Sequence, residues 1–290
     1  MPVLNLSDSQ TLALGTSAVK AAYLGSELKH FNPKAISGLE AWWDASDTSS
    51  VTLDAGRVAA LADKSGNSRH ATNGTSGSTQ PEYATAARNG RNVARFSAAS
   101  TQRLTVDDSQ AAFKFLHDGT ASYVAAVFST GFIADPNGLF AIFGNNLTST
   151  TNVGIVLQVD DRTPTFNMLL RIGIARGVSG GWCAIQENAS AFVPDQTHLV
   201  DVLIDADNAT ASQRVSPSVD GATLSETNTS TLSASASNAT ANMQIGAAGN
   251  QAQPHTGDIC EILMFSQQPT LSQRLALLGY LSLKWGVILA

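Results

Sequence analysis

Short runs of branched and aromatic apolar residues, separated by turn dipeptides, recur through most of the chain. Asp118-Gly119, Asn137-Gly138 and Asp220-Gly221 are examples of the turn dipeptides. The clearest apolar runs are residues 123–129, 139–143, 153–159, 166–174 and 199–204. Short apolar segments with such punctuation are typical of β-strands joined by tight turns. The chain is therefore expected to fold mainly as β-structure.

The runs differ in how strictly they alternate. Residues 153–159 alternate in part, which suits a strand with one exposed face, whereas residues 199–204 are almost continuously apolar, which suits a strand covered on both faces. A mixture of the two is expected from packed sheets. Residues 213–219, followed by Asp220-Gly221, predict a further hairpin. We therefore predict an all-β fold, a two-sheet antiparallel β-sandwich or jelly roll.

One convincing helix is predicted, at the C-terminus. Thr270 and Gln273 have capping-box spacing after Pro269, and Gly286 is a typical helix end. Apolar residues between these signals recur at helical intervals, so we expect one apolar stripe that packs across the sandwich. The stripe consists of Leu271, Leu275, Leu278, Leu281 and Trp285.

Residues 1–34 are expected to form a separate short β-module. Their apolar residues are spaced by small or polar ones, which predicts two or three short strands, too few to make a core alone. Such a module needs a partner, so we interpret it as an anchor and residues 35–290 as the sandwich with its helix. The candidate anchoring residues are Leu14, Val19, Tyr23, Leu24 and Gly25.

Composition excludes several classes of function. Charged residues make up 14% of the 290 residues, against about 25% in an average protein. The net charge is −6 and no block of Lys and Arg stands out, so we expect no nucleic-acid partner. No apolar stretch is long enough to span a membrane. The first residues show no secretion signal, so we expect any surface display to arise by assembly inside a host, followed by lysis.

The two cysteines, Cys183 and Cys260, are far apart and lack CxxC spacing. Cys260 lies in an apolar run and Cys183 follows Trp182, so both are interpreted as small core residues. Their disulfide state is not readable from the sequence.

An ordered set of motifs resembles a laminin-G-like, concanavalin A-like domain family that is common in phage and bacterial surface proteins. The set opens with Gly38-Leu-Glu-Ala-Trp-Trp-Asp-Ala-Ser-Asp47 and closes with Gly279-Tyr-Leu-Ser-Leu-Lys-Trp-Gly286, the most specific piece. Together the motifs bracket roughly residues 36–288. The resemblance implies a concanavalin A-like lectin fold. The pieces between the two ends are Arg57-Val58, Asp63-Lys-Ser-Gly-Asn67, His70-Ala71, Gln80-Pro81, Asn89-Gly90, Val93, Arg95-Phe96 and Gly257-Asp-Ile-Cys-Glu-Ile262.

A second resemblance concerns the first 30 residues. Val19-Lys-Ala-Ala-Tyr-Leu-Gly-Ser-Glu-Leu28 is similar to a short β-module at the ends of phage tail-fibre and head-surface proteins. Because it stands directly before a lectin-like domain, the pairing implies a structural protein on the surface of a bacteriophage virion.

Clustered oxygen ligands raise the question of a calcium site. Asp44, Asp47, Asp63 and Asn67 offer the hard donors that calcium prefers. The competing interpretation is that these side chains cap turns, where they accept from backbone N–H groups. The sequence favours turn capping, and no other cofactor is expected.

Among the tryptophans, Trp182 is the candidate for glycan contact because it follows Gly180-Gly181. Trp42 and Trp43 are adjacent, so in a strand they point to opposite faces and at least one is expected in the core. Trp285, on the helix stripe, is expected in the core as well.

No catalytic constellation is evident. Related folds include glucanases, which need two carboxylates near the scissile bond. The nearest pairs on predicted strands are Asp201 with Asp205 and Asp258 with Glu261, and neither has the required spacing. The five histidines show no metal-ligand spacing. We therefore expect a protein that is not an enzyme.

These observations predict a structural virion protein, either a capsid decoration or cement protein or a tail-fibre component. Its expected partners are other virion proteins, further copies of itself (a trimer is one option) and host surface glycans. A carbohydrate-binding host-recognition adhesin is the alternative, and a glycan hydrolase is the third option.

Overall fold

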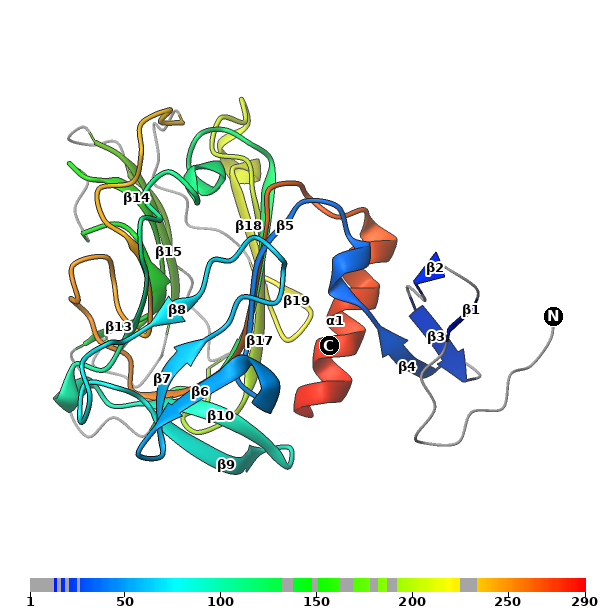
Figure 1. Ribbon diagram of the computed structural model, residues 1–290. Coiled ribbons are helices and arrows are strands. Elements are labelled where there is room, and N and C mark those ends of the chain that lie inside the picture. Colours follow the sequence, from blue (N-terminus) through cyan, green and yellow to red (C-terminus); the bar gives the residue numbers. More distant parts are fainter. Residues whose placement is uncertain are drawn as a thin grey trace.

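The computed structural model confirms an all-β sandwich with one C-terminal helix (Figure 1). It describes residues 13–14, 17–18, 21–24, 27–131, 138–147, 151–161, 169–177, 182–186, 192–224 and 234–290. For residues before 31 and for residues 182–186 only the backbone is described. Among the described residues, no helix is long and apolar enough to cross a membrane.

The first sheet lies at the centre of the molecule, between the second sheet and the helix. Its middle strand, β21 (Gly257–Phe265), pairs with β12 (Ser122–Phe128) on one edge. The other edge pairs with β10 (Arg91–Phe96) and then with β5 (Leu39–Asp44). All of these pairings are antiparallel. The sheet is completed by β9 (Glu82–Arg88) beside β10 and by β17 (His198–Ile204), β18 (Val215–Val219) and β19 (Ala222–Thr223) beyond β12.

The second sheet faces the first and is also antiparallel. A single pairing, Arg57 with Glu82, links the two sheets at one border. Its strands, from edge to edge, are β6 (Val51–Asp54), β7 (Arg57–Leu61), β8 (Ala71–Thr72), β11 (Leu104–Val106), β20 (Met243–Ile245), β13 (Leu139–Gly144), β14 (Val153–Asp160), β15 (Leu169–Arg176) and β16 (Trp182–Gln186). Short 3-10 turns lie at Pro33–Ala35, Thr48–Ser50, Ala98–Ser100, Lys114–Leu116 and Ala211–Gln213.

Two hydrophobic layers explain the strand sequences. The main core lies between the sheets and receives alternate residues of β21, such as Ile262 and Met264. The remaining side chains of β21, such as Leu263 and Phe265, pack under the helix. Because both faces are covered, all nine residues of β21 are buried. Seven of them are apolar or glycine, and the two carboxylates, Asp258 and Glu261, form ion pairs.

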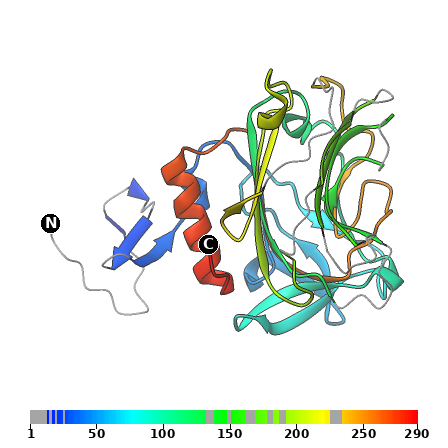
Figure 2. The same cartoon turned by 180° about the vertical axis from the view of Figure 1, so that it is seen from behind.

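The helix α1 (Leu271–Trp285) begins and ends as the sequence predicts. Thr270 and Gln273 form the complete capping box, and Gly286 ends the helix in the left-handed region, with a φ of 72°. α1 covers the outer face of the first sheet, with Leu278, Leu281 and Trp285 buried (Figure 2).

The predicted apolar stripe is wrong at its N-terminal end. Leu271 and Leu275 are 69% and 58% exposed, and they point away from the sheet. Leu277 takes their place in the buried layer. The helix carries apolar residues on both sides, so spacing alone did not identify the buried side.

The expected strands are present with small changes at their ends. The run predicted over residues 166–174 is the strand β15, which begins at Leu169, and residues 162–168 lie outside the described part of the chain. The predicted hairpin after residue 213 is confirmed as β18 and β19, joined at Asp220 and Gly221.

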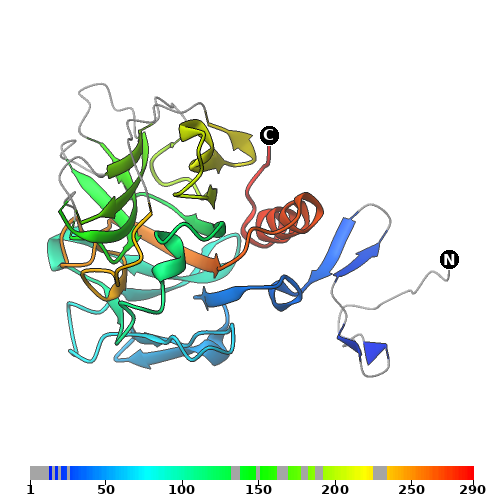
Figure 3. The ribbon, with the colours of Figure 1, turned by 90° about the horizontal axis from the view of Figure 1, so that it is seen from above.

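Four short strands precede the sandwich. β1 (Ala13–Leu14) pairs with β2 (Ser17–Ala18), and β3 (Ala21–Leu24) pairs with β4 (Glu27–Phe31). Neither of these described pairs joins a sheet of the sandwich. They lie beyond α1, and β4 runs beside that helix (Figures 1 and 3). Phe31 is buried with its ring 5.7 Å from that of Tyr280, so the packed body extends to Phe31.

Candidate functional site

Asp63, a calcium candidate, accepts four hydrogen bonds from protein groups. Its Oδ1 accepts from the backbone N–H groups of Trp42 (2.9 Å) and Ser65 (2.8 Å). Its Oδ2 accepts from the Ser65 hydroxyl (2.7 Å) and the Arg69 N–H (3.0 Å). These are the turn-capping contacts of the competing interpretation, and they tie the turn to strand β5.

Asp47 and Asn67 are also engaged by protein groups. Asp47 caps a 3-10 turn by accepting from the Ser49 N–H, and it forms a 2.7 Å ion pair with Lys64. The hydrogen bond from Lys64, with those from Ser49, lowers the Asp47 pKa to about 2. The Asn67 amide donates to the carbonyls of the first two residues of β5. Asn67 therefore holds its loop to the first sheet, and Asp47 links two loops to each other.

Asp44 is the most buried of the four candidates. Lys64 and Lys284 each lie 2.8 Å from its Oδ2, and Ser46 donates to its Oδ1. Burial disfavours its charge, but Lys284 and Lys64 outweigh burial and lower the Asp44 pKa. Within the described ranges, no group of three or more His, Cys, Asp or Glu side chains is arranged to hold a metal ion.

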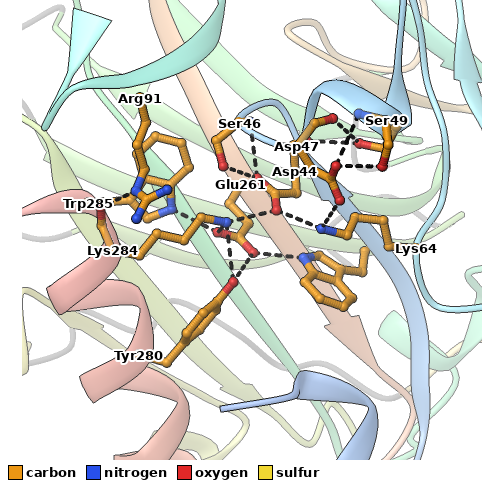
Figure 4. A network of polar contacts seen from close by, with 12 residues as sticks. Asp44, Ser46, Asp47, Ser49, Lys64, Arg91, Glu261, Tyr280, Lys284 and Trp285 are labelled. Atoms are coloured by element: carbon orange, nitrogen blue, oxygen red, sulfur yellow. Dashed lines mark hydrogen bonds and ion pairs between the residues drawn. The ribbon is translucent and has the colours of Figure 1, made fainter. Parts of the chain in front are cut away.

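Glu261 on β21 is the centre of a buried polar network that includes Asp44 (Figure 4). Its Oε1 accepts from the indole N–H of Trp42 (2.7 Å) and from the Tyr280 hydroxyl (3.3 Å). Its Oε2 accepts from Lys284 (2.7 Å) and from the indole N–H of Trp285 (2.8 Å). The network joins β5, β21 and α1 under the helix.

The burial and ion pairing of this network indicate that it stabilises the fold. Burial raises the Glu261 pKa, and Lys284 opposes that rise. Removing one partner of such a buried pair costs about 3–5 kcal/mol, because the remaining charge stays buried without compensation. Trp42, Asp44, Lys64 and Trp285 all belong to the motifs that carry the family resemblance. These motif residues therefore fix α1 to the first sheet.

Of the other carboxylates of the enzyme hypothesis, Asp205 accepts from the Asn208 amide (2.9 Å), and Asp201 and Asp258 are bound to basic side chains. Asp201 is buried and accepts from Arg274 of α1 at 2.6 Å. Asp258 is fully buried between Arg88 (2.6 Å) and Arg95 (2.7 Å), which overcome burial and lower its pKa. A glycosidase needs two carboxyl groups facing one ligand, whereas these groups are committed to ion pairs.

The tryptophans occupy the places that strand alternation predicts. Trp43 faces the main core and Trp42 faces the helix layer, so both are buried. Trp285 is buried too, as predicted. Trp182 begins β16, where its backbone pairs with Ala175 of β15. Its side chain lies outside the described part, so its role as a glycan contact stays a prediction.

The candidate anchoring residues fall on the N-terminal strands where they are described. Leu14 lies in β1, and Tyr23 and Leu24 lie in β3. Val19 and Gly25 lie outside the described residues. The anchoring role itself stays a prediction. Of the cysteines, Cys260 is a free, buried thiol whose pKa burial raises, and the Cys183 side chain is not described.

A polar row that the sequence did not reveal crosses the outer face of the second sheet. Gln158 of β14 pairs with Arg171 of β15, which pairs with Gln186 of β16. Arg171 also lies 3.7 Å from Asp160. Gln158 is nearly fully buried, and its Oε1 has no hydrogen-bond partner in the described structure. A buried acceptor of this kind favours an added donor.

The neighbours of this row are small. Val156 of β14 pairs with Gly173 of β15, and the next pairs along the same face are Gly154 with Ala175 and Ala175 with Trp182. Of the polar groups in the row, the Arg171 guanidinium is partly exposed, whereas Gln158 and Asp160 are nearly fully buried. Arg171 is therefore the group of the row that is available to hydrogen-bond a hydroxyl group of a ligand. The signal was absent from the sequence because it depends on the pairing register of three strands.

Comparisons with known proteins give distant likenesses in structure. No family model matches the chain, and no curated protein matches its sequence. Domain 4 of AbnA, an extracellular GH43 arabinanase from Geobacillus stearothermophilus solved with arabinotriose, is 15% identical over 84% of this chain and 99% of that chain, with a TM-score of 0.48. The CBM40 of the Ruminococcus gnavus IT-sialidase, solved with α2,3-sialyllactose, is 14% identical over 58% of this chain and 86% of that chain, with a TM-score of 0.43.

A third likeness is to the NanB sialidase from Streptococcus pneumoniae. It is 13% identical over 63% of this chain, with a TM-score of 0.43. The match covers 26% of the sialidase, so this chain resembles only a part of that enzyme. At these identities the likenesses concern the β-sandwich fold.

Proposed function

We propose that the chain is a non-catalytic structural protein of a bacteriophage particle, attached by its N-terminal strands and displaying the sandwich on the particle surface. The observation that carries the proposal is the contrast between the two parts. β1–β2 and β3–β4 are two-stranded pairs that join neither sheet of the sandwich, and β4 lies beside α1, while the sandwich and α1 form a packed body. Two-stranded sheets are marginal alone in water, so these pairs suit a segment completed by another protein.

The sandwich and α1 have properties expected of a domain that is displayed on a particle surface. The strand carboxylates considered for glycan hydrolysis, Asp201, Asp258 and Glu261, are held by Lys and Arg side chains and are therefore committed to ion pairs. The net charge of −6 favours solubility of a protein present in many copies. Both a capsid decoration protein and a tail-fibre component fit this description.

The test is to image particles that carry this chain and to count its copies by quantitative mass spectrometry. We expect the sandwich on the outer surface, with hundreds of copies for a capsid protein or a few dozen or fewer for a tail component. Absence of the chain from purified particles would overturn the proposal.

A deletion variant tests the attachment segment. Removing residues 1–30 keeps Phe31 and the packed body, so the variant is expected to fold but to be lost from particles. Incorporation at the level of the full chain would show that attachment lies elsewhere. The matched control is Leu53→Ala, an exposed change on β6, which is expected to leave incorporation unchanged.

The polar row on the second sheet favours a second candidate function, binding of host surface glycans. The partly exposed Arg171 presents its guanidinium group, and the Trp182 position lies on the neighbouring strand of the same sheet. We expect Arg171→Ala to abolish binding on a glycan array, and Arg103→Ala, on the strand-flanking turn before β11, to leave it unchanged. A full chain that binds no glycan would remove this candidate and leave the structural role intact.

A further inference from the structure

The turn between β9 and β10 consists of an Asn-Gly pair. Arg88 of β9 pairs with Arg91 of β10, so Asn89 and Gly90 form the turn. Their φ angles are 44° and 70°, in the left-handed region that both central residues of a type I′ hairpin turn adopt. Both residues are exposed, and nothing in the described structure lies within 4 Å of the place that a β-carbon on Gly90 would occupy. The Gly90 backbone is therefore open to its surroundings.

The Asn89 side chain reaches the C-terminal end of α1, which lies beside the turn (Figures 1 and 2). Its amide nitrogen donates to the backbone carbonyl of Lys284 at 3.1 Å and to that of Leu283 at 3.5 Å. The last four carbonyls of a helix have no partner within the helix, so Asn89 supplies a donor that this end lacks. The fit is close, because a β-carbon on Gly286 would lie 3.1 Å from the Asn89 Cγ.

Arg91 makes a second contact to the same helix end. Its Nε donates to the Lys284 carbonyl at 2.8 Å. We call these bonds from Asn89 and Arg91 to the carbonyls of Leu283 and Lys284 the hairpin–helix contact. A helix C-terminus carries the negative end of the helix dipole, which donors and cations stabilise and a carboxylate destabilises. The contact therefore depends on an amide, rather than a carboxylate, at position 89.

An Asn-Gly pair is also the place where a side-chain amide is most easily lost, because glycine leaves its own backbone nitrogen unhindered. The Gly90 nitrogen attacks the Asn89 Cγ, the carbon–nitrogen bond of the side-chain amide breaks, and ammonia leaves with the proton of the Gly90 N–H. Water then opens the five-membered imide ring at either of its two carbonyl groups. Residue 89 becomes an aspartate or an isoaspartate, and water is the only co-reactant.

Asn73-Gly74 is a pair of the same kind in a protected place. Asn73 is buried, and its amide nitrogen donates to the carbonyls of Thr79 and Arg103 at 2.9 and 3.0 Å. Its amide oxygen accepts from the Thr75 N–H. These partners belong to the sandwich, so the Asn73 amide is released only when that part of the sandwich opens. The two pairs share a dipeptide and differ in what holds the amide.

We propose that Asn89 is a deamidation site whose reaction follows opening of the hairpin–helix contact and prevents that contact from closing again. Ring closure requires the Asn89 Cγ to turn toward the Gly90 nitrogen, so the amide leaves the helix end before it reacts. The product carboxylate then faces the Lys284 carbonyl and the negative end of the α1 dipole, and Arg91 alone remains to hold the turn. This modification is independent of the virion role.

Incubation of the full chain in mildly alkaline buffer, followed by peptide mapping with mass spectrometry, measures the conversion at both sites. Asn89 should convert at least about ten times faster than Asn73, because an exposed contact opens far more often than the inside of a folded sheet. Arg91→Ala weakens the hairpin–helix contact and should raise the Asn89 rate several-fold, while the exposed control Lys34→Ala should leave it unchanged. Equal rates at Asn89 and Asn73, or an Asn89 rate that Arg91→Ala does not change, would overturn the proposal.

Asn89→Asp tests the consequence of the reaction. This variant carries a product carboxylate from the start, so the backbone amides of β9 and β10 next to the turn should exchange their hydrogens faster than in the unaltered chain. Asn89→Ala removes the donor without adding a charge and should have a smaller effect. Hairpin amides that exchange no faster in Asn89→Asp than in the unaltered chain would also overturn the proposal, because the carboxylate would then leave the contact closed.

Discussion

The two faces of α1 reverse the usual arrangement of a surface helix. The inner face buries Arg274 and Lys284 against the carboxylates of Asp201 and Glu261. The outer face exposes Leu271 and Leu275 to solvent. A surface helix usually turns its charges to water and its leucines to the core. The reversal means that α1 is held to the first sheet by ion pairs as well as by apolar packing.

The inner face also explains what the resemblance motifs do. Trp42 and Lys64 near the start of the sandwich and Trp285 near its end are distant in sequence, yet they meet around Asp44 and Glu261. The motifs close the fold by joining its first strand, its last strand and its helix. The proposed glycan binding is therefore to be tested away from this network, at Arg171 on the outer face of the second sheet.

Removing Lys284 is the strongest way to break the inner face. In Lys284→Met, Asp44 and Glu261 lose their shared cation while both remain buried, which should lower the free energy of unfolding by about 3–5 kcal/mol. Denaturant unfolding measures the loss. The exposed control Lys34→Met should change stability by less than about 0.5 kcal/mol. Equal effects of the two substitutions would mean that the network contributes nothing.

A matched pair of leucines compares the faces directly. Leu281 is fully buried and Leu275 is 58% exposed on the same helix. Leu281→Ala should cost about 2–5 kcal/mol through lost burial and a cavity, and Leu275→Ala less than about 0.5 kcal/mol. Thermal or denaturant unfolding of both variants at low protein concentration checks this. A loss at Leu275 as large as that at Leu281 would contradict the assignment of the faces.

Lowering the pH should reduce the free energy of unfolding over a defined pH range. Asp44, Asp47 and Asp258 have pKa values below the usual 3.8, that of Asp47 at about 2. Their stabilising contribution is therefore complete above pH 3.8 and lost as the pH falls through the lowered values. Glu261 behaves in the opposite way. Burial raises its pKa above the usual 4.5, so the charged carboxylate lowers the stability of the fold, and its protonation as the pH falls removes that loss.

Unfolding midpoints at pH 6, 5, 4, 3 and 2 measure the balance. We expect little loss, or a slight gain, down to about pH 4 and a steep loss between pH 3.8 and 2. Asp44→Asn should flatten the acid limb relative to the unaltered chain. A steep loss already complete above pH 4 would contradict the directions of these pKa values.

The helix cap provides the smallest test. Thr270→Ala removes the side chain that accepts from the Gln273 N–H, which should cost about 1 kcal/mol. Thr270→Ser keeps the hydroxyl and should stay near the unaltered chain. Denaturant unfolding distinguishes them, and an alanine variant as stable as the serine variant would show that the cap does not hold the helix.

Much of the fold was predictable because the relevant signals are local. The capping box at Thr270 and the Gly286 end marked α1 to the residue. The almost continuous apolar run of residues 199–204 indicated a strand covered on both faces, and in β17 all of these residues except Leu203 are buried. These features depend on neighbours within a few positions, so the sequence contains them in full.

The side on which α1 places its charged residues and the polar row were not predictable in the same way. Leu271 and Leu275 fitted a helical stripe, but the burial of Arg274 depends on Asp201, 73 residues earlier in the chain. A charged residue is expected to face solvent until its distant partner is known. The row from Gln158 to Gln186 likewise depends on the register of β14, β15 and β16, which the sequence does not determine.

Native-state hydrogen exchange of the α1 backbone amides is the most direct test of the claim that the inner network makes this helix part of the body. We predict that the amides from Lys284 back to Leu277 exchange only with a free energy close to that of global unfolding, because the helix cannot detach without exposing Glu261 and its partners. Exchange of these amides by local opening, at a free energy far below the global value, would contradict the account.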